Sequence, residues 1–132
     1  MTGLSTELTV LAYAGLLQYV QFVLMAVPLN VQLGPKYTAG PRDTHQDPAG
    51  VPGRLYRALD NHFQALILFT IAVIVVELGQ ESSGLTRNAA WAYLYSRIAY
   101  VPAYASGVPY LRSAVWAVGF AATLTMLIDS LF

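Results

Sequence analysis

Cysteine is absent from this 132-residue chain, which excludes disulfides, thiolate metal sites and a cysteine nucleophile. Charge is scarce as well: Asp, Glu, Lys and Arg make up 11% of the residues, whereas ordinary soluble domains contain about 25%. The formal net charge is zero and the sequence has no basic run, so nothing indicates a nucleic-acid partner.

Other functional signals are missing too. The two histidines, His45 and His62, have no acidic companions at ligand spacing, so we expect no metal site. The sequence contains no phosphate-binding loop, serine elbow or zinc motif. Residues 1–9 lack Lys and Arg, unlike a cleavable signal peptide, so we expect the first apolar segment to remain as a membrane helix.

Hydrophobic residues are abundant, at 56% of the chain, which is more than a small core can bury. The residues from Leu8 to Leu29 carry no charge and would form a helix about 33 Å long, enough to cross a bilayer. We expect Pro28 to bend or end this helix. The apolar runs predict an all-α integral membrane protein, a single domain over residues 1–132 with four transmembrane helices. Their expected ranges are 6–30, 53–78, 86–105 and 110–131.

The expected loop at residues 31–52 is rich in Pro and Gly and lies on the opposite side of the membrane from both termini. Its side of the bundle carries most of the basic residues, namely Lys36, Arg42, Arg54, Arg57 and Arg112. The side with the termini carries Arg87. The positive-inside rule therefore predicts a cytoplasmic loop and external termini.

Two polar faces occur on otherwise apolar helices. The first lies at the start of the second helix, within an arc of about 120°, and comprises Arg54, Arg57, Asp60, Asn61 and Gln64. The second lies on the third helix, within about 60°, and comprises Tyr93, Arg97, Tyr100 and Tyr104. Polar stripes are costly in lipid, so we expect them to face a protein-lined cavity where the function resides.

The two faces also lie at the same depth in the membrane. Asp60 lies about 10 Å from the start of its helix and Arg97 about 12 Å from the same end of the next helix, at 1.5 Å per residue. A buried arginine needs a partner, and Asp60 is the only acid at that depth. We therefore predict an Arg97–Asp60 pair, within one chain or across a subunit boundary, with Asn61 and Gln64 as neutral acceptors.

These residues carry a family resemblance. Arg57-Ala58, then Asn61 and Gln64, is similar to the Arg-Ala-x-x-Asn-x-x-Glu signature of the MAPEG family, the membrane-associated proteins of eicosanoid and glutathione metabolism. Residues 96–100 followed by Tyr104 resemble the third-helix pattern of that family. Residues 110–113 before Trp116, and residues 40–43 in the loop, resemble its bacterial branch. The resemblance covers nearly the whole chain.

The resemblance implies a homotrimeric four-helix bundle, with glutathione as co-substrate at sites between subunits. It implies a membrane glutathione transferase or peroxidase that acts on lipophilic electrophiles or lipid hydroperoxides, in a bacterial inner membrane. It places Arg57, Asn61, Arg97, Tyr100 and Tyr104 on the peptide and gives Arg112 the role of stabilising the thiolate. The candidate ligand-binding set drawn from both polar faces is Arg54, Arg57, Asn61, Gln64, Tyr93, Arg97, Tyr100 and Tyr104.

Three departures from the family pattern keep a second interpretation open. Gln64 stands where the signature has Glu, Ala65 stands where the best-known glutathione-binding members have Tyr, and Arg112 is one residue out of register. The polar faces could instead be structural hydrogen-bond networks, and Arg112 an interfacial anchor. The alternative is a non-catalytic membrane protein that binds a lipid or quinone-like amphiphile, or an accessory subunit of a larger membrane complex.

Overall fold

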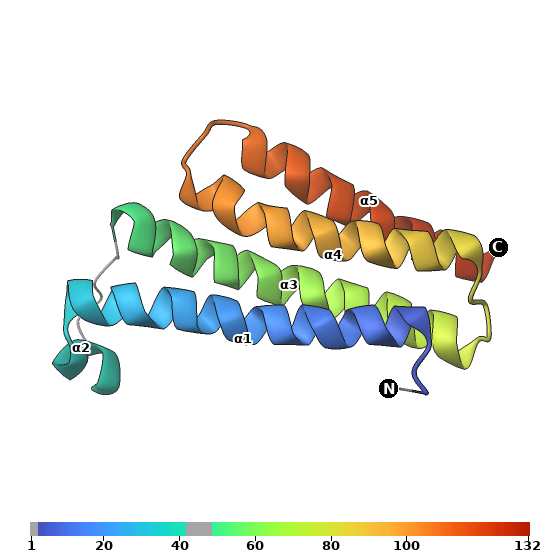
Figure 1. Cartoon of the computed structure of the whole chain (residues 1–132), viewed down its shortest axis with the longest axis horizontal. Coiled ribbons are helices and arrows are strands. Elements are labelled where there is room, and N and C mark those ends of the chain that lie inside the picture. The colour runs from blue at the N-terminus through green and yellow to red at the C-terminus, as the bar shows by residue number, and fades with distance from the viewer. Residues whose placement is uncertain (1–2, 42–48) are drawn as a thin grey trace.

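The computed structural model describes residues 3–41 and 49–132 as helices packed side by side along their length (Figure 1). The helices are α1 (Thr6–Leu33), α2 (Pro35–Ala39), α3 (Gly50–Leu78), α4 (Gly84–Ala105) and α5 (Leu111–Leu131). Both termini lie at one end of the bundle, whereas α2 and the α4–α5 turn lie at the other (Figure 1). Each long helix therefore runs antiparallel to the one before it.

Four helix ends differ from the expected ranges by one to three residues, and the largest differences flank the expected loop at residues 31–52. α1 continues through Pro28 to Leu33 and stops at Gly34, whose φ of 89° is accessible to glycine at little cost and ends the helix. The expected loop 31–52 is correspondingly shorter: α2 occupies Pro35–Ala39 and α3 begins at Gly50. Arg42, Asp43 and His45 lie outside the described residues.

Side chains of the connections hold the helix ends together. The Gln32 side chain donates to the Ala49 carbonyl and accepts from the Ala49 N–H, both at 2.9 Å, which ties the end of α1 to the start of α3. At the other end of the bundle, the Ser83 hydroxyl accepts from the Thr86 N–H at 3.2 Å, and the Thr86 hydroxyl accepts from the Ser83 N–H at 2.8 Å. This capping box satisfies two otherwise unpaired donors and fixes where α4 begins.

The core is built from aliphatic side chains and two aromatic ones. Phe69 of α3 stacks on Tyr93 of α4, with ring centroids 3.9 Å apart and planes 6° apart. Close approach of α5 depends on Gly119, because a Cβ there would lie 2.5 Å from the Ser96 hydroxyl oxygen. The buried cluster comprises Val10, Ala14, Phe69, Ala72, Val73, Val76, Ala89, Ala90, Tyr93, Leu94, Ala122 and Met126.

A carboxylate is buried at the end of the bundle that holds the termini. Glu7, in the first turn of α1, is fully buried and accepts hydrogen bonds from Ser82 at 2.8 Å and Thr86 at 2.6 Å. The Ser5 hydroxyl donates to Glu77 of α3 in the same region. Charged and hydroxyl side chains therefore connect α1, α3 and the start of α4 where the apolar core ends.

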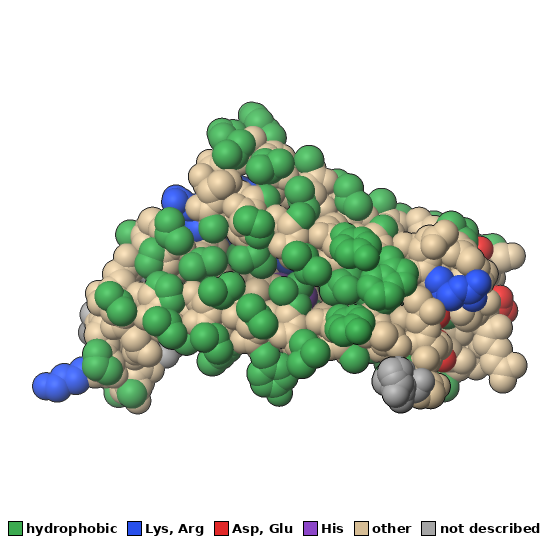
Figure 2. Space-filling model, in the orientation of Figure 1, with side chains coloured by type: hydrophobic (Ala, Val, Ile, Leu, Met, Phe, Trp, Pro, Cys, Tyr) green, Lys and Arg blue, Asp and Glu red, His purple; other side chains and the backbone are tan. Residues whose placement is uncertain are grey.

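The outer surface is apolar over the middle of the bundle. In Figure 2, hydrophobic side chains cover this middle, and Lys, Arg, Asp and Glu side chains gather toward the two ends. Among the described helices, α1, α3 and α5 are long and apolar enough to cross a membrane. The chain is therefore an all-helical integral membrane protein whose apolar flank contacts lipid.

The contact at Gly119 leads to a prediction about stability. Gly119→Ala should lower the free energy of unfolding by about 1–3 kcal/mol, because its methyl group displaces the Ser96 hydroxyl from the Tyr93 carbonyl, to which it donates at 2.7 Å. The double variant Gly119→Ala/Ser96→Ala should recover part of that loss, because the hydroxyl that meets the new methyl group is gone. Gly15→Ala is the control, since nothing lies within 4 Å of a Cβ there. Unfolding in detergent compares the unaltered protein with the two single variants, the double variant and the control, and strictly additive effects would contradict the contact.

Candidate ligand-binding groove

Arg97 of α4 lies inside the bundle, with 1% of its surface exposed. Its Nη1 donates to the Asn61 side-chain oxygen at 3.0 Å, and its Nε donates to Nδ1 of His62 at 3.4 Å. The guanidinium also lies over the Tyr100 ring, 4.3 Å from the centroid. Neutral acceptors and an aromatic face thus surround this buried cation.

His62 connects this cation to a third helix. Its Nε2 lies 3.2 Å from the carbonyl oxygen of Ala14 in α1. The neutral tautomer with its proton on Nε2 satisfies both contacts, because it donates to Ala14 and accepts from Arg97. The sequence analysis assigned His62 no role, because it lies off the polar face of its helix. Its depth, level with Arg97, was the signal that could have identified it.

The expected Arg97–Asp60 contact is absent from the described chain, which corrects that prediction within one subunit. Adjacent residues of a helix point about 100° apart, so when Asn61 faces α4 its neighbour Asp60 turns away. Asp60 is exposed and lines a separate groove of about 560 Å³ between α1, α2 and α3. Arg97 is instead held by the amide of Asn61 and the ring of His62.

Arginines gather around Tyr104 at the end of the bundle that contains the α4–α5 turn. Arg57 Nε donates to the Tyr104 hydroxyl at 3.3 Å, and the Arg112 guanidinium lies 4.8 Å from the centre of the Tyr104 ring. Arg54 Nε donates to the Ala105 carbonyl at 3.0 Å. These arginines line a cavity of about 550 Å³, and no acidic side chain lines it among the residues that the structure describes.

This outer cavity continues into the bundle through two smaller ones. Arg112 and Ser113 also line a middle cavity of about 210 Å³, which reaches Asn61 and Trp116. Asn61 and Trp116 in turn line an inner cavity of about 180 Å³ between α3, α4 and α5. The three cavities follow one another through these shared residues, and we call them together the arginine groove. All nine candidate residues line it: Arg54, Arg57, Asn61, Gln64, Tyr93, Arg97, Tyr100, Tyr104 and Arg112.

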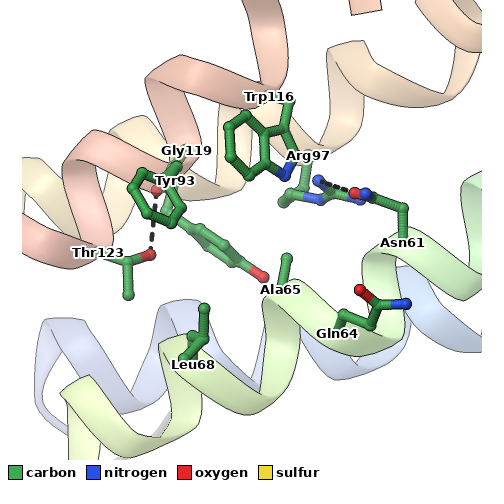
Figure 3. Close-up of a pocket in the computed structure, with 10 residues that line it drawn as sticks. Asn61, Gln64, Ala65, Leu68, Tyr93, Arg97, Trp116, Gly119 and Thr123 are labelled. Carbon is green, nitrogen blue, oxygen red and sulfur yellow. Dashed lines mark hydrogen bonds between the residues drawn. The ribbon is translucent and has the colours of Figure 1, made fainter. Parts of the chain in front are cut away.

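The inner cavity has apolar walls and two polar atoms without a partner. In Figure 3 the Tyr93 hydroxyl points past Ala65, and the Arg97 guanidinium reaches toward Asn61 beneath Trp116. The Tyr93 hydroxyl and Arg97 Nη2 are buried and have no hydrogen-bond partner within the described part of the chain. Trp116, which the sequence analysis did not include among the candidate residues, lines both the middle and the inner cavity.

The fold and the groove define a class: a helical integral membrane protein with a groove that runs from an arginine-rich opening to an apolar cavity. The sequence profile of the MAPEG family matches residues 10–132. The chain therefore belongs to the MAPEG family, which confirms the resemblance found in its sequence. MAPEG proteins are in general oligomeric and associated with glutathione. Comparison with curated proteins found no match.

The contacts of Arg97 lead to a prediction by double-mutant analysis. Arg97→Met and His62→Phe should couple by about 0.5–3 kcal/mol in the free energy of unfolding, because each leaves the other's buried group unpaired. Arg97→Met and Asp60→Asn should instead be additive. Thermal unfolding of the single and double variants in detergent measures both couplings. Strong coupling to Asp60 with none to His62 would contradict this arrangement.

Proposed function

We propose that this protein is a membrane glutathione transferase or peroxidase that acts on lipophilic electrophiles or lipid hydroperoxides. The observation that carries the proposal is the arginine groove. Arg54, Arg57 and Arg112 line an outer cavity without an acidic side chain in the described part of the chain, and this cavity leads into an apolar inner one. Glutathione is an anion at neutral pH, and its carboxylates match guanidinium groups in shape and charge.

In this proposal, the chemistry takes place at the middle cavity, between the outer and the inner cavity. The glutathione peptide lies along Arg57, Tyr104 and Asn61, and its sulfur lies near Arg112. The thiolate is the nucleophile, and a free thiol has a pKa near 8.5, so a nearby guanidinium raises the reactive fraction at neutral pH. Arg112 suits this role because it lines both the outer and the middle cavity.

The proposed setting is a bacterial inner membrane. α4 serves as the fourth span beside α1, α3 and α5, and its buried Arg97 is tolerated because Asn61 and His62 solvate it. The end of the bundle with Lys36, Arg54, Arg57 and Arg112 is cytoplasmic and the termini are external. The assembly is a homotrimer, and the exposed side chains of Leu68 and Phe120 lie where the groove opens to lipid or to a neighbouring subunit.

A second candidate function rests on the walls of the inner cavity. Gln64 provides no anion to pair with the ammonium group of glutathione, and Ala65, Leu68 and Phe120 make the inner end apolar. These residues favour a non-catalytic protein that holds a lipid or quinone-like amphiphile, alone or as a subunit of a larger membrane complex. In that case the arginines bind the polar head of the amphiphile.

Calorimetric titration of glutathione sulfonate into the detergent-purified protein tests the proposal. Arg57→Ala and Asn61→Ala should each weaken binding by about 1–3 kcal/mol, because each removes a charge-assisted or polar contact. Gln64→Glu should strengthen glutathione binding by restoring a partner for the ammonium group.

Arg87→Ala is the matched control, because this exposed arginine lies near the start of α4, at the opposite end of the bundle. The Arg87→Ala variant should bind glutathione sulfonate with the affinity of the unaltered protein. Absence of binding up to several millimolar would reject the enzyme in favour of the amphiphile-binding protein. Unchanged affinity in all the groove variants would show that glutathione binds elsewhere.

A further inference from the structure

The inner cavity contains two fixed hydrogen-bond donors that the chain itself does not use. Tyr93 and Arg97 are each about 1% exposed, and the Tyr93 hydroxyl and Arg97 Nη2 have no partner within the described residues. The Tyr93 ring cannot easily turn away, because it is stacked on Phe69 with centroids 3.9 Å apart. The other nitrogens of Arg97 are held by Asn61 and His62. A buried donor without a partner is costly, which favours a ligand that accepts from both.

The charge of the site indicates which kind of acceptor it favours. The described partners of Arg97 are Asn61, His62 and Tyr100, none of which is a carboxylate. No acidic side chain lines the inner cavity among the residues with described positions. A buried cation with neutral partners stabilises an oxygen that carries or develops negative charge, and this effect is strong in a low-dielectric interior.

The size and walls of the cavity limit what can accompany that oxygen. Its volume of about 180 Å³ exceeds only slightly the roughly 150 Å³ of a protein cavity that binds benzene, so it holds the reactive head of a molecule and not a whole lipid. Leu68 and Phe120 line it and are 45% and 48% exposed, so it opens between α3 and α5 onto the apolar flank. A hydrocarbon tail can leave by this route into lipid.

From these observations we infer that the inner cavity binds the head of a lipophilic α,β-unsaturated carbonyl compound. The carbonyl oxygen accepts from the Tyr93 hydroxyl and from Arg97 Nη2, and the tail extends past Leu68 and Phe120. The binding part of this inference stands alone, whereas the reaction rests on the proposed glutathione transferase activity. Tyr93 and Arg97 thereby form an oxyanion site for the second substrate.

The reaction is a conjugate addition. The thiolate sulfur attacks the β-carbon and forms the C–S bond, while the electron pair of the C=C bond shifts toward the carbonyl oxygen and gives an enolate. Tyr93 and Arg97 hold that enolate oxygen. The α-carbon then takes up, through solvent, the proton that the thiol released. The product is a saturated carbonyl thioether, with no net oxidation or reduction.

A binding experiment without glutathione tests the site directly. The probe is nonan-2-one with a ¹³C-labelled carbonyl, which cannot undergo the addition, and the readout is its infrared carbonyl stretch with the detergent-purified protein. The unaltered protein should give a band at lower frequency than the ketone in empty micelles, because two donors weaken the C=O bond. Tyr93→Phe, which removes only the hydroxyl, should move the bound band back toward higher frequency.

Two further variants complete the binding experiment. Ala65→Leu should abolish the shifted band by filling the cavity that Ala65 lines. Tyr95→Phe is the matched control, because Tyr95 lies on the same helix but is 63% exposed, and its band should equal that of the unaltered protein. Absence of a shifted band in the unaltered protein, or a band unaffected by both Tyr93→Phe and Ala65→Leu, would overturn the inference.

A kinetic experiment tests the reaction. With glutathione and trans-2-nonenal, Tyr93→Phe should lower kcat/KM by about 100-fold, the usual scale for the loss of one oxyanion donor. With 1-iodononane, whose displacement by the thiolate develops no charge on oxygen, the same variant should lose far less of its kcat/KM. Equal losses with both electrophiles would show that Tyr93 acts on packing and not on the carbonyl oxygen.

The two proposals can fail separately. A shifted carbonyl band that depends on Tyr93, in a protein that does not bind glutathione sulfonate, would reject the transferase and retain the carbonyl site. Binding of glutathione sulfonate without a shifted band would retain the transferase and reject the carbonyl site.

Discussion

The buried guanidinium of Arg97 is the constraint around which this bundle is arranged. A cation in the middle of an apolar helix pack must be solvated by protein, and here Asn61 and His62 of α3 do so. His62 also contacts the Ala14 carbonyl and so links Arg97 to α1. Arg97 thus links three helices, and its remaining nitrogen, Nη2, is buried without a partner among the described residues.

The polarity of the groove changes along the bundle axis. Its outer end presents guanidinium groups on Arg54, Arg57 and Arg112, which suit an anion that arrives from water. Its inner end presents apolar walls beside a fixed hydroxyl, which suit a molecule that arrives from lipid. This gradient supports the proposed transferase, in which the thiol enters from water and its electrophile enters from lipid.

The sequence predicted much of this arrangement, and its failures share one cause. Long apolar runs predicted the helices, and helical periodicity together with depth predicted that residues such as Arg57, Arg97 and Tyr104 would lie along one groove. A helical wheel gives the direction of a side chain, but it does not show which neighbouring helix packs against that face. That is why Asp60 was paired with Arg97 and His62 was overlooked. The sequence analysis did not single out Glu7, because its hydroxyl partners lie in and after the turn between α3 and α4, and a helical wheel does not place a turn.

Two of the three residues that depart from the family pattern, Gln64 and Ala65, line the inner cavity. A large side chain at Ala65 would occupy space that the Tyr93 hydroxyl now faces (Figure 3). Gln64 in place of an acid leaves the inner cavity without a negative charge among the described residues, so that the positive charge of Arg97 is not cancelled there. Ala65 therefore enlarges the inner cavity, and Gln64 keeps its electrostatic potential positive. Such changes weaken the case for tight binding of the peptide ammonium, yet they favour an oxygen that becomes negative during reaction.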